Sequence, residues 1–117
     1  MIFDQVIIAM TPTAPIPGTN YIVKGLGTTK DGQPTLVYYI PNNRNPQKRS
    51  EKSITRSECQ QAYDQLLRAG EFTRKWFNEV MPERAATAPC NFRAIGQTFV
   101  FLGIAGYRRG TYTRRLP

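Results

Sequence analysis

Residues 53–70 read SITRSECQQAYDQLLRAG and contain the strongest local structural signals in the chain. Thr55 followed by Glu58 has the spacing of a capping box, and Ile54 can pack on Cys59 as a hydrophobic staple. Apolar residues then recur at steps of three and four along one face: Cys59, Ala62, Tyr63, Leu66 and Leu67. Gly70 stands where a left-handed C-terminal cap is needed. We therefore expect a helix over about residues 56–69.

A second helix is expected at Arg74–Met81, after the cap residue Thr73 and before Pro82. Two helices joined by a tight turn that contains glycine form a helix-turn-helix unit. Arg74 and Lys75 occupy the first turn, where the helix dipole disfavours cations. Phosphate binding would explain both side chains. Screening by solvent, which makes the dipole penalty negligible, is the alternative.

Residues 89–103, PCNFRAIGQTFVFLG, support two interpretations. As a helix over 91–102 they place four apolar side chains on one side: Phe92, Ile95, Phe99 and Leu102. Arg93 and Gln97 would project from the opposite side, and these are residue types that read guanine and adenine in the major groove. A strand at 98–102 is the competing interpretation, because that segment is β-prone and Gly96 costs a helix about 1 kcal/mol. We favour the helix.

Residues 104–115, IAGYRRGTYTRR, indicate a hairpin that turns at 108–110. Two arginines, Arg108 and Arg109, would sit at its tip, and two more, Arg114 and Arg115, on its return strand. Such a basic wing can lie along a nucleic-acid backbone or in a minor groove. A mobile basic tail is the alternative, but Tyr107 and Tyr112 favour ordered cross-strand pairing.

The first half of the chain is expected to be rich in β-structure. Residues 2–10 are predicted to form a strand, and the three prolines within 12–17 an extended connector. The β-prone segments 21–26 and 35–40 flank an Asp-Gly turn signal and predict a hairpin. Residues 42–52 predict a loop, in which Lys48 and Arg49 are candidate phosphate contacts; a merely solvated loop is the alternative.

The order of these elements resembles the winged helix-turn-helix superfamily over about the second half of the chain. The resemblance implies an α+β fold: a winged helix-turn-helix-like domain with an N-terminal β-hairpin extension. We expect one domain over residues 1–117, with a β-rich part (1–41), a basic loop (42–53), a helical core (54–102) and a hairpin wing (103–117). Most members of the superfamily bind DNA, which implies a third helix in the major groove, although some bind only proteins or RNA.

Composition points toward a polyanionic partner. Sixteen Lys and Arg against eight Asp and Glu give a formal net charge of +8. The leading hypothesis is a small protein that binds double-stranded DNA. The contacts are expected from Arg74, Lys75, Arg93, Gln97, Arg108, Arg109, Arg114, Arg115, Lys48 and Arg49. The alternatives are a protein-interaction module or homodimer built on the apolar hairpin 21–40, and RNA binding with Tyr38, Tyr39, Tyr107 and Tyr112 as stacking surfaces.

Enzymatic activity is not expected. The chain has no histidine, so neither an ordinary Ser-His or Cys-His pair nor the usual structural zinc site can form. No phosphate-binding glycine loop is present, and no cofactor or metal is expected. Cys59 is interpreted as a core thiol rather than half of a disulfide with Cys90. No apolar run is long enough to span a membrane, and we expect a cytoplasmic protein.

Overall fold

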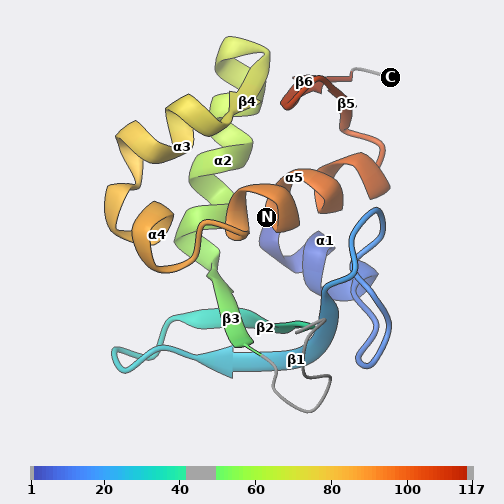
Figure 1. Ribbon diagram of the computed structural model, residues 1–117, viewed down its shortest axis with the longest axis vertical. Coiled ribbons are helices and arrows are strands. Elements are labelled where there is room, and N and C mark those ends of the chain that lie inside the picture. The colour runs from blue at the N-terminus through green and yellow to red at the C-terminus, as the bar shows by residue number, and fades with distance from the viewer. Residues whose placement is uncertain (1, 42–49, 116–117) are drawn as a thin grey trace.

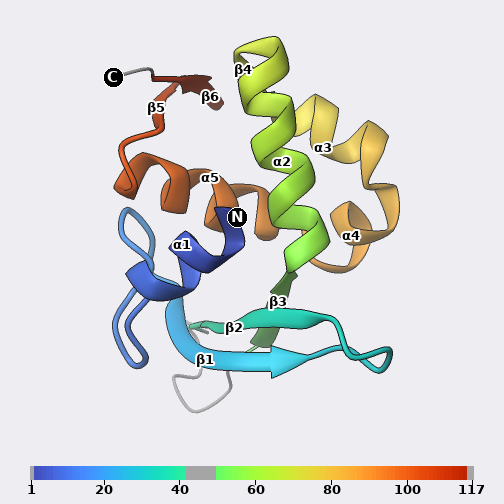
Figure 2. The same cartoon turned by 180° about the vertical axis from the view of Figure 1, so that it is seen from behind.

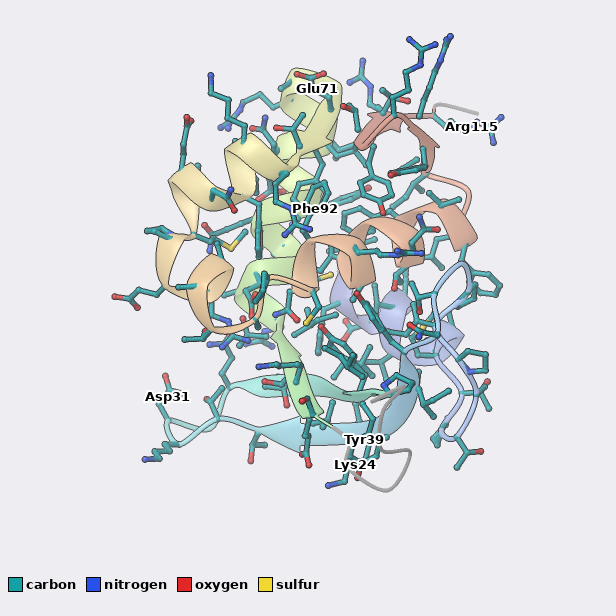
Figure 3. All side chains as sticks on the ribbon, viewed as in Figure 1. Lys24, Asp31, Tyr39, Glu71, Phe92 and Arg115 are labelled. Carbon is teal, nitrogen blue, oxygen red and sulfur yellow. The ribbon has the colours of Figure 1, made fainter. Side chains whose placement is uncertain are left out.

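Two three-stranded antiparallel sheets lie at opposite ends of the molecule, and the helices fill the space between them (Figure 1). The computed structural model describes residues 2–41 and 50–115. Figure 3 marks the two ends: Glu71 and Arg115 lie by one sheet, Lys24 and Tyr39 by the other, and Phe92 between them. The fold is mixed α and β, as the sequence predicted.

The N-terminal segment is a helix, α1 (Ile2–Ala9), so the prediction of a strand at residues 2–10 was wrong. Its buried residues, Ile2, Phe3 and Val6, together with Met10 just beyond the helix, are spaced to form one helical face. Burial of that face outweighs the β-propensity of the isoleucines and the valine. Figure 2, the view from behind, shows α1 in front of part of α5 and beside α2.

The predicted hairpin is confirmed as β1 (Ile22–Thr28) paired with β2 (Pro34–Ile40). The proline-containing connector is extended beside it, with Pro15 bridged to Ile22. A third strand, β3 (Ser50–Thr55), pairs with the other edge of β2, so the loop prediction was wrong for residues 50–52. Residues 42–49, with Lys48 and Arg49, lie outside the described residues. Polar residues suit β3 because it is an edge strand in which Ile54 is the buried residue.

The best-supported local prediction is confirmed in α2 (Arg56–Ala69). Thr55 and Glu58 form the reciprocal capping box, and Gly70 ends the helix with φ of 80°. After the short strand β4 (Glu71–Thr73), Thr73 caps α3 (Arg74–Val80) by accepting the backbone N–H of Trp76. The segment before the third predicted helix, whose shape the sequence left open, contains a short helix, α4 (Pro82–Thr87).

The ambiguous segment is a helix, α5 (Asn91–Phe101), so the competing strand at 98–102 does not form. Gly96, which weakened the helix prediction, has a packing role. A Cβ at this position would lie 2.2 Å from the Tyr112 ring, so glycine is what allows that ring to approach the helix. α5 is covered on most of its circumference: seven of its residues are buried, and Arg93 and Phe101 are its exposed residues.

The C-terminal hairpin is confirmed as β5 (Ala105–Arg108) paired with β6 (Thr111–Arg114). The strand order of the second sheet is β4-β6-β5, so β4, which lies between α2 and α3, pairs with the outer side of the hairpin. Phe72 of β4 packs edge-on or tilted against the rings of Trp76, Phe77, Phe92, Phe99 and Tyr112. This aromatic cluster joins the hairpin to the helices.

A buried polar network joins β2, β3, α2, α4 and α5. Asn91 donates from Nδ2 to Glu58 Oε2 (3.0 Å) and to the Ser53 carbonyl (2.9 Å), and it accepts from the Tyr38 hydroxyl. The Arg84 Nε lies 2.9 Å from Glu58 Oε1. Because the Glu58 side chain is only 4% exposed, its charge depends on these donors for compensation.

Candidate nucleic-acid interface

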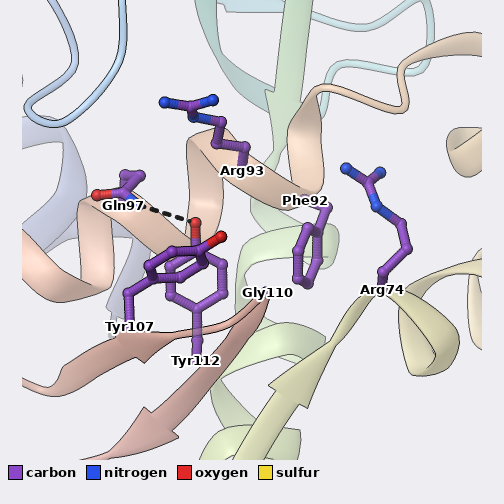
Figure 4. Close-up of a pocket in the computed structure, with 7 residues that line it drawn as sticks. All are labelled: Arg74, Phe92, Arg93, Gln97, Tyr107, Gly110 and Tyr112. Carbon is purple, nitrogen blue, oxygen red and sulfur yellow. Dashed lines mark hydrogen bonds between the residues drawn. The ribbon is translucent and has the colours of Figure 1, made fainter.

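An open cavity of about 320 Å³ lies between α3, α5 and the β5–β6 hairpin (Figure 4). Residues from all three elements reach it because the β4–β6 pairing holds the hairpin beside the start of α3, and the approach of Tyr112 to Gly96 holds it against α5. The lining combines cations, an amide and aromatic rings: Arg74, Phe92, Arg93, Gln97, Tyr107, Gly110 and Tyr112. Three of the sequence-predicted site residues, Arg74, Arg93 and Gln97, are therefore brought together.

Arg74 borders one side of the cavity. Its guanidinium carbon lies 4.6 Å from the centroid of the Phe92 ring, and Nη1 donates to the Pro89 carbonyl at 2.6 Å. The cation–π contact and the hydrogen bond hold the side chain in place while it remains exposed. Lys75 is also exposed but does not line the cavity. The placement leaves Arg74 able to bind an anion entering the cavity.

Arg93 and Gln97 differ in how they are held. Arg93 is exposed, and its Nη2 donates to the Gly18 carbonyl of the connector at 3.0 Å. Gln97 is half-buried, and its Nε2 donates to the Tyr112 hydroxyl at 3.1 Å. A Cβ at Gly18 would lie 2.3 Å from Gln97 Oε1, so the connector closely covers this amide. Contact between Gln97 and a ligand therefore requires exchange of an existing hydrogen bond.

The tip of the hairpin is a two-residue turn formed by Arg109 and Gly110, with φ of 50° and 81°. Turns with positive φ at both central positions favour Asn-Gly, and a left-handed conformation costs a residue such as arginine roughly 1 kcal/mol. Arg108 and Arg109 are exposed at this tip, beside the cavity residues Tyr107 and Gly110. Arg109 is exposed, so packing does not explain why an arginine occupies this strained position. Backbone strain of this kind is often found at binding sites.

Two further predicted contacts, Arg114 and Arg115, are exposed at the end of β6. Arg114 Nη1 donates to the Leu67 carbonyl near the end of α2 at 2.6 Å. This bond ties the return strand to the helix and leaves part of the guanidinium in solvent. The surface at this end of the molecule is therefore cationic over the hairpin and the neighbouring helix ends.

Three aromatic residues, Phe92, Tyr107 and Tyr112, line the cavity. Sequence reasoning missed Phe92, which it assigned to the core, and it proposed Tyr107 and Tyr112 for hairpin pairing and as stacking surfaces. The rings of Tyr107 and Tyr112 lie 4.8 Å apart. Burial raises the pKa of Tyr112, and its hydroxyl accepts a hydrogen bond from Gln97 Nε2. The signal in the sequence was the position of Tyr107 directly before Arg108 and Arg109.

Two of the four candidate stacking tyrosines are not accessible. Tyr38 and Tyr112 are buried, with 0% and 1% of their surface exposed, so the hypothesis that both present open faces to RNA was wrong. Tyr39 is half-buried and contacts Lys24. Tyr107, 53% exposed, is the tyrosine of this set that presents an open face.

Within residues 2–41 and 50–115, no group of three or more Cys, Asp and Glu side chains is arranged to hold a metal ion. Cys59 and Cys90 are both free thiols, and burial raises the pKa of Cys59 to about 12. In the same part of the chain, no helix combines the length and apolar character needed to cross a bilayer.

Comparisons of the chain with protein families, curated proteins and solved structures found no match.

Proposed function

We propose that this protein binds double-stranded DNA through α5 and the β5–β6 hairpin, and that residues 54–115 form a winged helix-turn-helix. Support for the fold comes from the order α2, β4, α3, α4, α5, β5, β6 and from the pairing of β4 with β6, the second strand of the hairpin. In this arrangement α5 is the recognition helix and the hairpin is the wing.

The observation that carries the proposal is the convergence of cations on one surface. Arg93 on α5 and Arg74 on α3 line one depression, and Arg109 is exposed at the hairpin tip next to Gly110, which also lines it. Side chains from three elements can thus contact adjacent phosphates and a groove edge together. Lys75, Arg114 and Arg115 extend the positive surface beyond the cavity.

The two base-reading candidates have different roles in this proposal. Arg93 is exposed and long enough to reach a base edge after it releases the Gly18 carbonyl. Gln97 is held by Tyr112 and the connector, so it contributes to base reading only where the ligand replaces the Tyr112 hydroxyl. Because α5 exposes so narrow a strip, phosphate contacts are expected to supply most of the affinity and base contacts modest specificity.

The decisive experiment is a fluorescence-anisotropy titration of duplex DNA at several salt concentrations. Released counterions make the logarithm of the association constant fall linearly with the logarithm of salt concentration. Arg109→Asn is the sharpest variant, because asparagine suits the turn and should stabilise the fold by about 1 kcal/mol. We expect it to weaken binding and to reduce the salt slope by about one.

Lys30→Asn is the matched control. It removes the same charge from an exposed residue at the tip of the β1–β2 hairpin, in the opposite sheet. We expect it to change affinity much less than Arg109→Asn does. Absence of duplex binding at low salt, or equal effects of the two variants, would refute the proposed interface.

A second function, self-association through the 21–40 hairpin, has one observation in its favour. Leu26 on the edge strand β1 is 67% exposed. The other large apolar side chains of the hairpin are mostly covered by the chain itself, with Val23, Leu36 and Tyr38 buried. Sedimentation of the wild type and Leu26→Lys distinguishes the cases, since a hairpin dimer would dissociate in the variant.

A further inference from the structure

Contact with DNA phosphates accounts for the arginines around the cavity but not for its aromatic walls. Phosphates are recognised by cations and N–H donors, whereas exposed rings offer surface for a planar, weakly polar ligand. Tyr107 is 53% exposed on β5, at the edge of the cavity, although its ring packs on one side against Tyr112. An aromatic ring so placed exposes apolar surface to water unless a ligand covers it.

The polar groups of the cavity match the edge of a nucleobase. The Gln97 amide and the Tyr112 hydroxyl, bonded at 3.1 Å, line the cavity beside Tyr107, as Figure 4 shows, and a base edge can bond to them by replacing that hydrogen bond. Arg93, one turn from Gln97 on α5, and Arg74, on α3, line the same cavity and supply positive charge for the phosphate attached to a base. One cavity thus combines an aromatic ring, polar groups and cations, which are the groups that recognise the base and the phosphate of a nucleotide.

The size of the cavity restricts the ligand further. About 320 Å³ is at the lower end of the range for small-molecule sites and suits one nucleotide rather than a base pair. A paired base within a duplex has its faces stacked and its Watson–Crick edge occupied, so it cannot enter. A base that is extruded, bulged or at a single-stranded end is free to do so.

We propose that the cavity binds one unpaired base of the DNA held by α5 and the hairpin, stacked on Tyr107 with its flanking phosphate at Arg74 and Arg93. This inference rests on the proposed DNA-binding function and specifies the kind of DNA preferred. The protein then binds duplexes that contain an unpaired nucleotide more tightly than continuous duplexes.

The test compares three duplexes of the same sequence in anisotropy titrations at one salt concentration. One is fully paired, one has a single unpaired adenine at its centre, and one has an abasic residue at the same place. The abasic bulge has the same backbone interruption without a base, so it controls for increased bending. We expect the adenine bulge to bind about tenfold more tightly than the other two, the range that stacking of one base supports.

Substitutions at Tyr107 assign the preference to the cavity. Tyr107→Ala should lower affinity for the adenine bulge about tenfold more than affinity for the paired duplex, which removes the preference. Tyr107→Phe keeps the ring and should retain the preference. Because Tyr107 is largely exposed, neither change is expected to unfold the protein. Circular dichroism of both variants checks that they are folded.

The outcomes separate this inference from the function on which it rests. Equal binding of the adenine and abasic bulges, or an equal loss by Tyr107→Ala on all three duplexes, would overturn the base site while duplex binding stood. No binding of any duplex would overturn both. Titration with deoxyadenosine monophosphate tests whether the cavity binds a free nucleotide instead of a base within DNA. Binding of the free nucleotide without a preference for the adenine bulge would also overturn the inference.

Discussion

Gly96→Ala tests how the hairpin is held against α5. A Cβ at this position would lie 2.2, 2.3 and 2.5 Å from Tyr112 ring atoms, whereas ordinary contacts begin near 3.4 Å. The ring would have to move by more than 1 Å, since 3.4 minus 2.2 is 1.2. It is buried against Phe72 and Phe92, and its backbone pairs with strands on both sides, so it cannot simply rotate away.

The expected cost combines two opposing effects. Overpacking a well-filled site costs typically about 1–3 kcal/mol, and the upper end applies because the ring is part of the central strand of its sheet. Alanine in a helix interior is more favourable than glycine by about 1 kcal/mol. We therefore expect Gly96→Ala to lower the free energy of unfolding by about 2 kcal/mol.

Urea unfolding followed by the fluorescence of Trp76 measures this change, because Trp76 is the single tryptophan and packs against Phe72. The sharper version repeats the substitution in a Tyr112→Ala background. Without the ring, the helix-propensity term should remain alone, and Gly96→Ala should then stabilise by about 1 kcal/mol. An increase in stability in the wild-type background, or the same effect in both backgrounds, would refute the reasoning.

Two further predictions concern stability. Arg84→Ala removes a partner of the buried Glu58 carboxylate and should lower the free energy of unfolding by about 2 kcal/mol, less than for a fully buried pair because Arg84 is one-third exposed. The control Arg68→Ala, at an exposed site on α2, should cost under about 0.5 kcal/mol. Equal costs in urea unfolding would contradict the role of the network. Burial raises the pKa of Cys59 from 9.0 to about 12 and also raises that of Tyr38, so the folded state holds more protons than the unfolded state in alkaline solution. Stability should therefore fall between pH 9 and 12, by up to about 1.4 kcal/mol per pH unit for each group. Cys59→Ala should reduce that slope, and urea midpoints that are unchanged from pH 8 to 10.5 would contradict the prediction.

Local signals were sufficient for much of the second half of the chain. The capping box at Thr55 and Glu58, the glycine cap at Gly70 and the cap at Thr73 are interactions among residues close in sequence. Such interactions need no distant partner, so α2 and α3 were predicted close to their observed bounds. The arginine-tipped hairpin was predicted for the same reason, since its turn and its strands are adjacent along the chain.

Long-range packing decided what sequence reasoning missed. β3 was assigned to a loop because its residues are polar, but an unpaired edge of β2 was available to bind it. α1 was assigned to a strand because its residues favour strands, but burying a single face against the core required a helix. In both cases the partner surface is made by residues far away in the sequence.

By itself the sequence determined the positive charge, the lack of histidine, the helix boundaries set by caps and the hairpin with its arginines. Only the tertiary structure decided that the Tyr112 ring packs against Gly96 and that Gln97 donates a hydrogen bond to the Tyr112 hydroxyl. It also decided that Arg74, Arg93 and Tyr107 line one cavity. The physical reason is distance along the chain. Capping and turn formation act within a few residues, whereas a cavity exists only after α3, α5 and the hairpin have packed together.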